Sequence, residues 1–277
     1  MTDTDWLDPM KRRAAQAPAR PRRALWSSAS GGSVIGSLEP ALAERLIDAR
    51  LPIAATGATA GAGYGLAAPV DPALAAIARW LAAHRLGGRW RDELLAVADA
   101  SGVPVGVVER AAVRPLGITT RAVHLIGRRA DGRVWVQQRA LDKATDPGLW
   151  DTTMGGLMAA GESVADTLRR ETAEEAGLAI DALVGVAEHG QLEVRRPVAD
   201  GYMIEHIHVF EALVPDALVP VNQDGEVRGF ELLDAPALRA RLRAGVFTLE
   251  AGLILADWLA RREIEPVSSR SAVAAEK

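Results

Sequence analysis

Apolar residues at helical spacing mark the first third of the chain. Leucines recur every four residues within 37–50, and apolar residues form a single stripe over 72–85. Both segments therefore predict amphipathic helices, and a third helix is expected over 90–100. A Gly/Ala-rich stretch over 54–65 indicates a loop.

The pattern changes beyond Pro115, where β-branched and alternating residues become frequent. Segments 122–126 and 134–138 predict two strands joined through the turn Ala130-Asp131-Gly132. A helix is expected over 163–176. Further strands are expected over 183–186, 191–194 and 206–213, and closing helices over 236–243 and 249–262. This mixture has no repeating strand–helix rhythm, so it favours an α+β or mixed α/β fold over a doubly wound sheet.

These patterns divide the chain into four parts. Residues 1–23 are expected to be a flexible lead-in, and 24–115 a small, largely helical α+β domain. The main domain is expected over 116–265, followed by a disordered tail over 266–277 that is rich in Ser and Ala.

Composition narrows the classes of function. Of the 277 residues, 49% are hydrophobic and 25% are charged, which is typical of a globular protein. The formal net charge of −4 argues against nucleic acid as the partner. The chain has no cysteine, which excludes disulfides, thiolate zinc sites and a cysteine nucleophile. No apolar run is long enough for a membrane span. A cytoplasmic protein is expected, and whether it forms a homodimer stays open.

The stretch most informative about chemistry is GGLMAAGESVADTLRRETAEEAGL, residues 155–178. Ser163 with Asp166 three residues later resembles a capping box, which predicts where the helix begins. Gly177 is a natural residue just beyond the end of a helix. Both ends of the helix are therefore marked in the sequence.

Three glutamates gather on one face of this helix. Glu171, Glu174 and Glu175 lie at positions i, i+3 and i+4, where like charges repel and cost stability. Arg169 and Arg170 could compensate part of that charge. The alternative is a hard divalent cation, which prefers several carboxylate oxygens and commonly keeps water for a phosphate substrate.

The stretch resembles the Nudix box, G-x5-E-x7-R-E-U-x-E-E-x-G-U, where U is aliphatic. Every Gly, Arg and Glu of that pattern stands at the right offset, from Gly156 to Leu178. The one departure is Thr172, which affects packing and leaves the glutamates unchanged. The resemblance implies an α/β/α sandwich with a mixed sheet and a magnesium-dependent hydrolase of organic diphosphates, with Mn²⁺ as a substitute ion.

The resemblance also implies roles for individual residues. Glu171, Glu174 and Glu175 would be magnesium ligands. Arg170 would hold Glu162, which is itself a secondary ligand or base candidate; the catalytic set is then Glu162, Arg170, Glu174 and Glu175. Gly155 and Gly156 would line the substrate site, because a glycine lets the backbone approach metal and phosphate closely.

The lead-in RALDKATDPGLWDTTMGG, residues 139–156, resembles that of one Nudix branch, with Lys143, Pro147, Gly148 and Asp151 as its matches. Short segments between residues 90 and 125 match the same branch, which is related to the hydrolase half of fungal thiamine pyrophosphokinase fusions. It implies removal of the terminal phosphate from oxidised thiamine diphosphate, with thiamine monophosphate as product. In that branch a small N-terminal domain without an assigned role precedes the hydrolase.

Several other polar residues are candidates for the site. Glu226 is a candidate extra metal ligand or base, against the alternative of a solvated turn residue. Arg139 and Lys143 are candidates for binding the diphosphate, and salt bridges to the glutamates are an equally simple interpretation. His124 is expected in a buried strand, with a substrate role as the alternative.

Two pairs of side chains invite a ligand role but have simpler explanations. His206 and His208 share one face of a strand, yet a zinc site needs more nitrogen or sulfur ligands nearby. Trp90 and Trp135 could stack on a heteroaromatic ring, although core packing explains most tryptophans.

Other functions remain as alternatives. Isopentenyl diphosphate isomerase shares the Nudix fold, but by family resemblance its chemistry uses an active-site cysteine, which this chain lacks. Nucleoside diphosphate or ADP-ribose pyrophosphatase activity stays open. So does a non-catalytic Nudix-derived binding module, although such proteins usually have damaged box glutamates.

Overall fold

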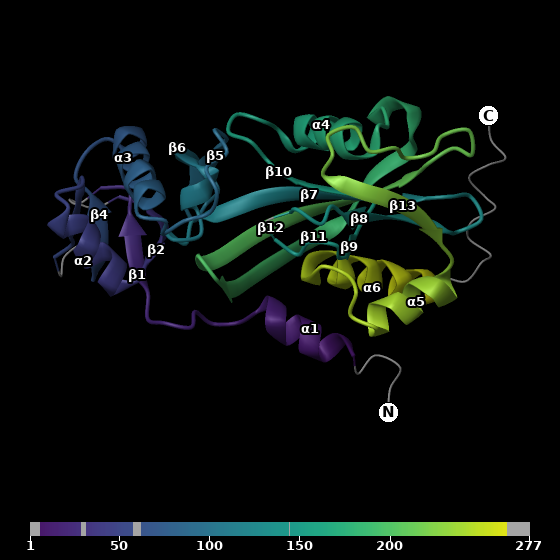
Figure 1. Ribbon diagram of the computed structural model, residues 1–277, viewed down its shortest axis with the longest axis horizontal. Coiled ribbons are helices and arrows are strands. Elements are labelled where there is room, and N and C mark those ends of the chain that lie inside the picture. Colours follow the sequence, from purple (N-terminus) through teal and green to yellow (C-terminus); the bar gives the residue numbers. More distant parts are fainter. Residues whose placement is uncertain (1–5, 29–31, 58–61, 144, 265–277) are drawn as a thin grey trace.

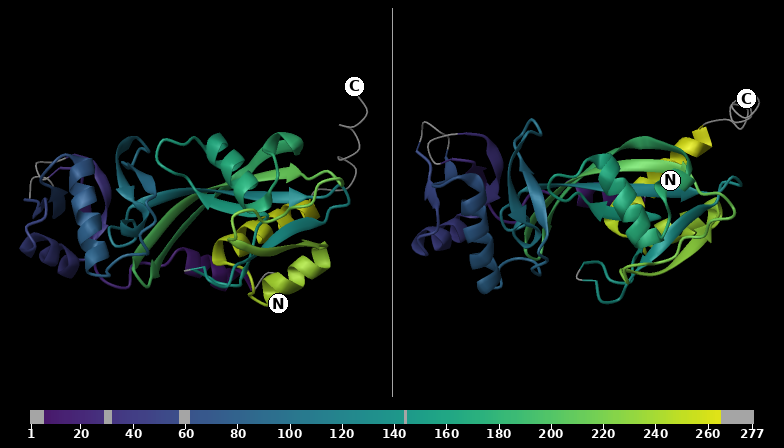
Figure 2. Two further views of the ribbon diagram at one scale, coloured as in Figure 1. Left: turned by 45° about the horizontal axis from the view of Figure 1, so that its top comes forward. Right: turned by 90° about the horizontal axis from the view of Figure 1, so that it is seen from above.

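The computed structural model describes residues 6–28, 32–57, 62–143 and 145–264 (Figure 1). The expected disordered tail, 266–277, lies outside the described residues. A large mixed sheet and its covering helices occupy the C-terminal half of the chain. A smaller group of strands and helices, residues 23–118, lies at one end of that sheet and is called the N-terminal unit below (Figure 2).

The large sheet has seven strands, in the order β11-β12-β7-β8-β13, with β10 pairing to β7 and β9 pairing to β8. Strands β7 and β12 are parallel and the other pairs are antiparallel, so the expected mixed sheet is confirmed. The strands are β7 (Thr119–Arg128), β8 (Val134–Arg139), β9 (Trp150–Asp151), β10 (Met154–Leu157), β11 (Val184–Val198), β12 (Gly201–Leu213) and β13 (Val227–Leu233). Segments 183–186 and 191–194, expected as two strands, belong to the single bulged strand β11.

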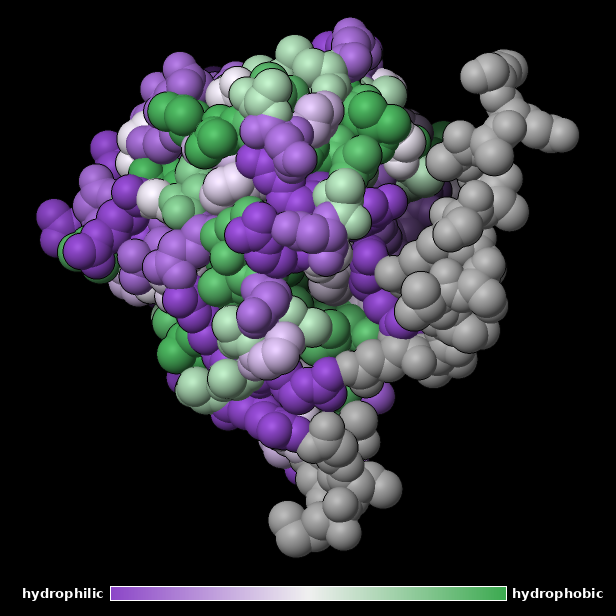
Figure 3. All heavy atoms as spheres, turned by 90° about the vertical axis from the view of Figure 1, so that its right-hand side faces the viewer, coloured by the Kyte–Doolittle hydropathy of each residue, from purple (hydrophilic) through white to green (hydrophobic). Residues whose placement is uncertain are grey.

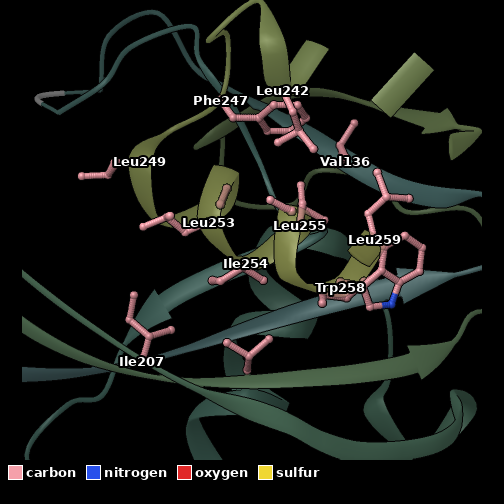
Figure 4. Packing of buried hydrophobic residues seen from close by; sticks show 14 of the residues in the cluster. Val136, Ile207, Leu242, Phe247, Leu249, Leu253, Ile254, Leu255, Trp258 and Leu259 are labelled. Carbon is pink, nitrogen blue, oxygen red and sulfur yellow. The ribbon is translucent and has the colours of Figure 1, made fainter. Parts of the chain in front are cut away.

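Helices cover both faces of this sheet, as the expected α/β/α sandwich requires. Helix α4 (Val164–Ala176) lies on one face, while α5 (Ala235–Arg243) and α6 (Leu249–Ile264) lie on the other (Figure 1). Leucine, isoleucine and tryptophan side chains of α6 share one apolar core with Leu242 of α5, with Phe247 and with Ile207 of β12 (Figure 4). A short 3₁₀ helix, η3 (Ile180–Ala182), follows α4.

The N-terminal unit has a core of its own. Its four-stranded sheet has the order β2-β1-β4-β3, and β5 and β6 form a separate hairpin. The elements are β1 (Arg23–Trp26), β2 (Val34–Leu38), α2 (Pro40–Asp48), β3 (Ile53–Ala55), β4 (Gly63–Leu66), α3 (Val70–Ala83), β5 (Leu94–Ala98), β6 (Pro104–Glu109) and the 3₁₀ helix η2 (Arg110–Ala112).

Two expectations for this unit are wrong. The segment 90–100, expected to be helical, contains strand β5, in which Leu95 and Val97 are buried and alternate with more exposed residues. Such alternation has the period of a strand. The expected loop over 54–65 includes strand residues at both ends, because β3 and β4 pair there. Alongside its helices, the unit therefore contains six strands in the described residues.

The lead-in expected to be flexible contains a packed helix, α1 (Leu7–Ala14). Leu7, Met10 and Ala14 recur at helical spacing, and they pack against the core that α6 forms on the sheet. Tyr202 donates a hydrogen bond of 2.7 Å to the carbonyl of Gln16, which ties the following segment to β12. The expectation of flexibility therefore fails at residues 7–14.

Polar and apolar side chains are intermingled on the end of the molecule that faces away from the N-terminal unit, where it is not covered by grey atoms (Figure 3). Among the described residues, no helix is both long and apolar enough to cross a lipid bilayer.

The packing of α6 generates a stability prediction. Leu255 is fully buried in this helix, so Leu255→Ala removes buried methyl groups and leaves a cavity. We expect the free energy of unfolding in urea to fall by about 2–5 kcal/mol. Leu141→Ala, at a position that is 68% exposed, is the matched control and should change it by less than about 0.5 kcal/mol. Equal effects of the two changes would contradict this account of the core.

Candidate metal and diphosphate site

The glutamate-bearing helix α4 begins and ends where the sequence predicts. The Ser163 hydroxyl accepts a hydrogen bond from the Asp166 amide at 3.1 Å, and the Asp166 carboxylate accepts one from the Ser163 amide at 3.2 Å. Gly177 follows the helix with φ of +62°, a left-handed conformation in which glycine avoids strain. These caps fix the ends of the helix that carries the glutamates.

Strand β10 faces those glutamates with two residues that lack side chains. The amide of Gly155 donates a hydrogen bond of 3.0 Å to Glu175, and a Cβ added at Gly156 would collide with the Glu171 carboxylate. Gly155 also packs against the ring of His124. The two glycines therefore let the backbone of β10 approach both carboxylates closely.

Burial changes the acidity of the two carboxyls. It raises the pKa of Glu175 to about 8 and the pKa of Glu171 to about 7, because a charged carboxylate loses solvation there. Among the described residues, Glu175 accepts hydrogen bonds from the amide of Gly155 and from the side chain of Gln137, at 2.9 Å. Both of these donors are uncharged.

Arg170 organises the other box residues. Its guanidinium donates to Glu162 at 2.6 and 2.8 Å, to Glu171 at 2.8 Å and to Glu174 at 3.0 Å. The hydrogen bonds from Arg170, with help from Thr167, lower the pKa of Glu162 to about 2 against the opposing effect of burial. The pairing of Arg170 with Glu162 that the family resemblance implies is present.

A pocket with about 810 Å³ of empty space, solvent at its mouth included, opens beside β10. Three candidate metal ligands line it together with all four candidate substrate residues; they are Glu171, Glu175, Glu226, Arg139, Lys143, Gly155 and Gly156. Glu162, Arg170 and Glu174 do not line this pocket and are joined to one another by the hydrogen bonds of Arg170.

The two candidate cations have carboxylate partners in the structure. Lys143 forms a salt bridge with Glu226, while Arg139 lies 3.3 Å from Asp151. Against the effect of burial, the hydrogen bond and the charge of Lys143 lower the pKa of Glu226, and the more distant charges of Arg91 and Arg110 add to this effect.

The pocket also contains functional groups that the sequence did not single out. Arg110, Arg114, Arg196, Glu205 and Glu250 line it from elements that are far apart in the sequence. Burial, followed by the charge of Glu250, raises the pKa of Glu205 to about 7 against the lowering effects of nearby arginines and Thr120. Arg110 lies in one of the short segments that resemble the Nudix branch, but the sequence indicated no role for it, and only the tertiary fold brings these five residues together.

His124 is buried, as the sequence predicted, and it also reaches the pocket. It is buried in β7, its Nδ1 lies 2.8 Å from the Thr152 hydroxyl, and its ring lines the pocket. Burial lowers the pKa of the imidazole, so His124 is neutral near pH 7.

The remaining histidine and tryptophan candidates lie elsewhere. His206 and His208 have separate carboxylate partners, Glu193 at 2.8 Å and Glu188 at 3.2 Å. Trp135 packs in the core under α4, which is the simpler of the two interpretations offered by the sequence. Trp90 is 39% exposed and donates a hydrogen bond to Asp92 outside the pocket lining.

The chemistry of the pocket fits a divalent cation. Glu171 and Glu175 are desolvated oxygen donors, the ligand type that magnesium prefers, and the glycines leave space beside them. Within the described residues, no three acidic or histidine side chains converge as a preformed metal site. Arg170 and Lys143 hold the oxygens of Glu171, Glu174 and Glu226 in this arrangement.

Parts of the chain are similar to known proteins. The NUDIX domain model matches residues 118–250. Nudix hydrolase 20, chloroplastic, of Arabidopsis thaliana is 31% identical over 190 residues, which cover 65% of this chain and 50% of that protein. Isopentenyl-diphosphate Delta-isomerase of Leifsonia xyli subsp. xyli is 32% identical over 171 residues, which cover 60% of this chain and 89% of the isomerase. The crystal structure of DR0079 from Deinococcus radiodurans has 26% identity and a TM-score of 0.48, covering 61% of this chain and 98% of DR0079.

Residues 118–250 of the chain are a NUDIX domain, and the segment from Gly156 to Leu178 that resembles the Nudix box lies within it. The chain spans about half the length of the plant relatives that it matches.

The close approach at Gly156 generates a prediction about metal binding. In Gly156→Ala the added Cβ must displace the Glu171 carboxylate, so we expect Mg²⁺ affinity, measured by calorimetry, to fall about tenfold or more. Gly229→Ala is the matched control, because nothing lies within 4 Å of a Cβ added there. Unchanged affinity in Gly156→Ala would remove Glu171 from the ligand set.

The raised pKa of Glu205 generates a prediction about stability. The pKa of Glu205 is about 7 in the folded protein, above its ordinary value of 4.5. The contribution of the protonated carboxyl to the free energy of unfolding is therefore complete below pH 4.5 and is lost as the pH rises through about 7. We expect Glu205→Gln to melt like the parent near pH 5 and about 2–4 °C higher near pH 8, measured by calorimetric melting and corresponding to ~1 kcal/mol. Glu44→Gln, exposed on α2, should match the parent at both pH values. The same melting difference at both would contradict the prediction.

Proposed function

We propose that this protein hydrolyses the diphosphate group of a small organic molecule with the help of Mg²⁺ or Mn²⁺. One observation carries the proposal: Glu171, Glu175 and Glu226 line a single pocket with Arg139 and Lys143. Carboxylates in such a pocket suit a divalent cation, and cations beside them suit phosphate oxygens.

The chemistry divides between the cation and the side chains. A bound divalent cation neutralises diphosphate oxygens and lowers the pKa of water. Glu171, Glu174 and Glu175 would hold the cation, with Glu226 as a further candidate ligand that now pairs with Lys143. A carboxylate of this cluster takes the proton of the attacking water. The water oxygen bonds to phosphorus as the bridging P–O bond breaks, which gives a monophosphate ester and inorganic phosphate.

For the organic group we propose thiamine, as oxidised thiamine diphosphate converted to the monophosphate. The sequence supports this through the lead-in residues Lys143, Pro147, Gly148 and Asp151, which resemble those of the thiamine-related branch. The pocket adds a physical argument, because Asp151, Glu205 and Glu250 offer carboxyl groups beside the diphosphate-binding cations. Such groups can accept hydrogen bonds from an aminopyrimidine ring.

This proposal is tested by measuring release of inorganic phosphate with and without Mg²⁺. The panel includes intact and oxidised thiamine diphosphates, ADP, ADP-ribose and isopentenyl diphosphate. We expect the highest kcat/KM on an oxidised thiamine diphosphate and no release after chelation by EDTA. Glu174→Gln should lower kcat by at least about 100-fold, whereas Glu44→Gln should leave it unchanged.

Each of the other possible results would show that a different part of the proposed function is wrong. Full activity of Glu174→Gln would overturn the assignment of the glutamates. Turnover of ADP or ADP-ribose alone would overturn the thiamine assignment and keep the hydrolase. Isomerisation of isopentenyl diphosphate would move the chain to the isomerase class, and tight binding of a diphosphate without turnover would identify a binding module.

A further inference from the structure

The N-terminal unit reaches the diphosphate pocket directly. The loop between β10 and α4 is attached to β5 by a hydrogen bond of 2.8 Å from the Ala160 amide to the Leu94 carbonyl. Beside this attachment, a second pocket opens between the unit and the sheet. Six residues line both pockets, which makes them arms of one cleft: Arg110, Arg114, Thr145, Leu157, Met203 and Glu205.

The second arm is rich in arginine. Arg89, Arg91, Arg110 and Arg114, all from the N-terminal unit, line it together with the acidic residues Asp200 and Glu205. Arg110 pairs with Glu93 at 2.7 Å, and Arg114 lies 3.5 Å from Asp200. Within the described part of the chain, Arg89 and Arg91 have no acidic side chain at ion-pair distance. The arm therefore has positive charge left over for a ligand.

This positive charge lies next to the candidate metal ligands. The charges of Arg91 and Arg110 act on the Glu226 carboxylate, and Glu226 shares the first pocket with Glu171 and Glu175. A diphosphate bound to these carboxylates through a cation would place one of its phosphates toward the N-terminal arginines.

We propose that Arg91, Arg110 and Arg114 form a clamp for the terminal phosphate, which makes the site selective for monosubstituted diphosphates. The inference rests on the proposed hydrolysis and assigns a function to the N-terminal unit. An unsubstituted terminal phosphate carries close to two negative charges and three acceptor oxygens, and guanidinium groups bind such oxygens in pairs. A phosphate that is esterified on both sides, as in ADP-ribose, has less charge and fewer free oxygens for the clamp.

The test compares ADP with ADP-ribose, which share the adenosine diphosphate and differ in whether its terminal phosphate is free. For the full-length protein with Mg²⁺, we expect the ratio of kcat/KM for ADP to that for ADP-ribose to fall about 10- to 100-fold in Arg110→Ala. Arg91→Ala should lower it in the same direction, and because Arg91 is exposed its removal leaves the fold intact. Arg79→Ala, on an exposed position of α3, is the matched control and should keep the parent ratio.

A binding measurement separates failure of the clamp from failure of the proposed hydrolysis. Methylenediphosphonate with Mg²⁺, titrated calorimetrically, should bind the parent and Arg79→Ala about tenfold or more tightly than Arg110→Ala. If the parent releases no phosphate from any compound but this difference persists, the clamp stands and the hydrolysis is wrong. Equal binding to parent and Arg110→Ala, no binding to the parent, or an unchanged kcat/KM ratio would each overturn the clamp.

Discussion

The contact between α4 and the glycines of β10 is the constraint on which the site depends. Because Gly155 and Gly156 have no side chains, the helix brings Glu171 and Glu175 against the strand backbone and away from water. Desolvation of two neighbouring carboxyls is costly unless they are protonated or meet a positive charge. Arg170 supplies part of that charge from outside, and the pocket leaves the inner side open to a cation. Burial of these two carboxyls therefore lowers the stability of the fold and creates a place where a cation can bind.

Local sequence signals predicted the limits of α4 and the shared face of its glutamates. The cap residues Ser163 and Gly177, the spacing of the glutamates and the glycines before them all lie within 23 residues, and each acts on its immediate neighbours. The longer strands β7 and β12 and the helices α4, α5 and α6 also follow from periodic segments in the second half of the chain. The strands β9, β10 and β13 were not expected from the sequence, and β9 and β10 are too short for a period to be recognised.

The rest of the cleft depends on contacts between distant segments. Glu205 occupies the pocket because β12 lies parallel to β7, a pairing that no local pattern reveals. Arg110 follows a hairpin whose five-residue strand β5 is too short for its alternation to outweigh the helix propensity of Ala and Leu. Helix α1 is short and charged, so it is not stable as an isolated helix. It is stabilised because its apolar residues pack against the core that includes α6.

The path of the chain has a mechanical consequence. Helix α1 is packed beside α6, on the far face of the large sheet from α4, before the polypeptide crosses to the N-terminal unit and returns through β7 (Figure 1). The unit is therefore held by two covalent connections, one on each side, and resembles an insertion more than an appended module. Two chain connections restrict rotation of the N-terminal unit about either of them. We therefore expect the spacing between the two arms of the cleft to stay the same when ligands enter and leave. Removal of roughly the first hundred residues would also remove α1, which packs against α6. The C-terminal half is therefore expected to be less stable when it is produced alone.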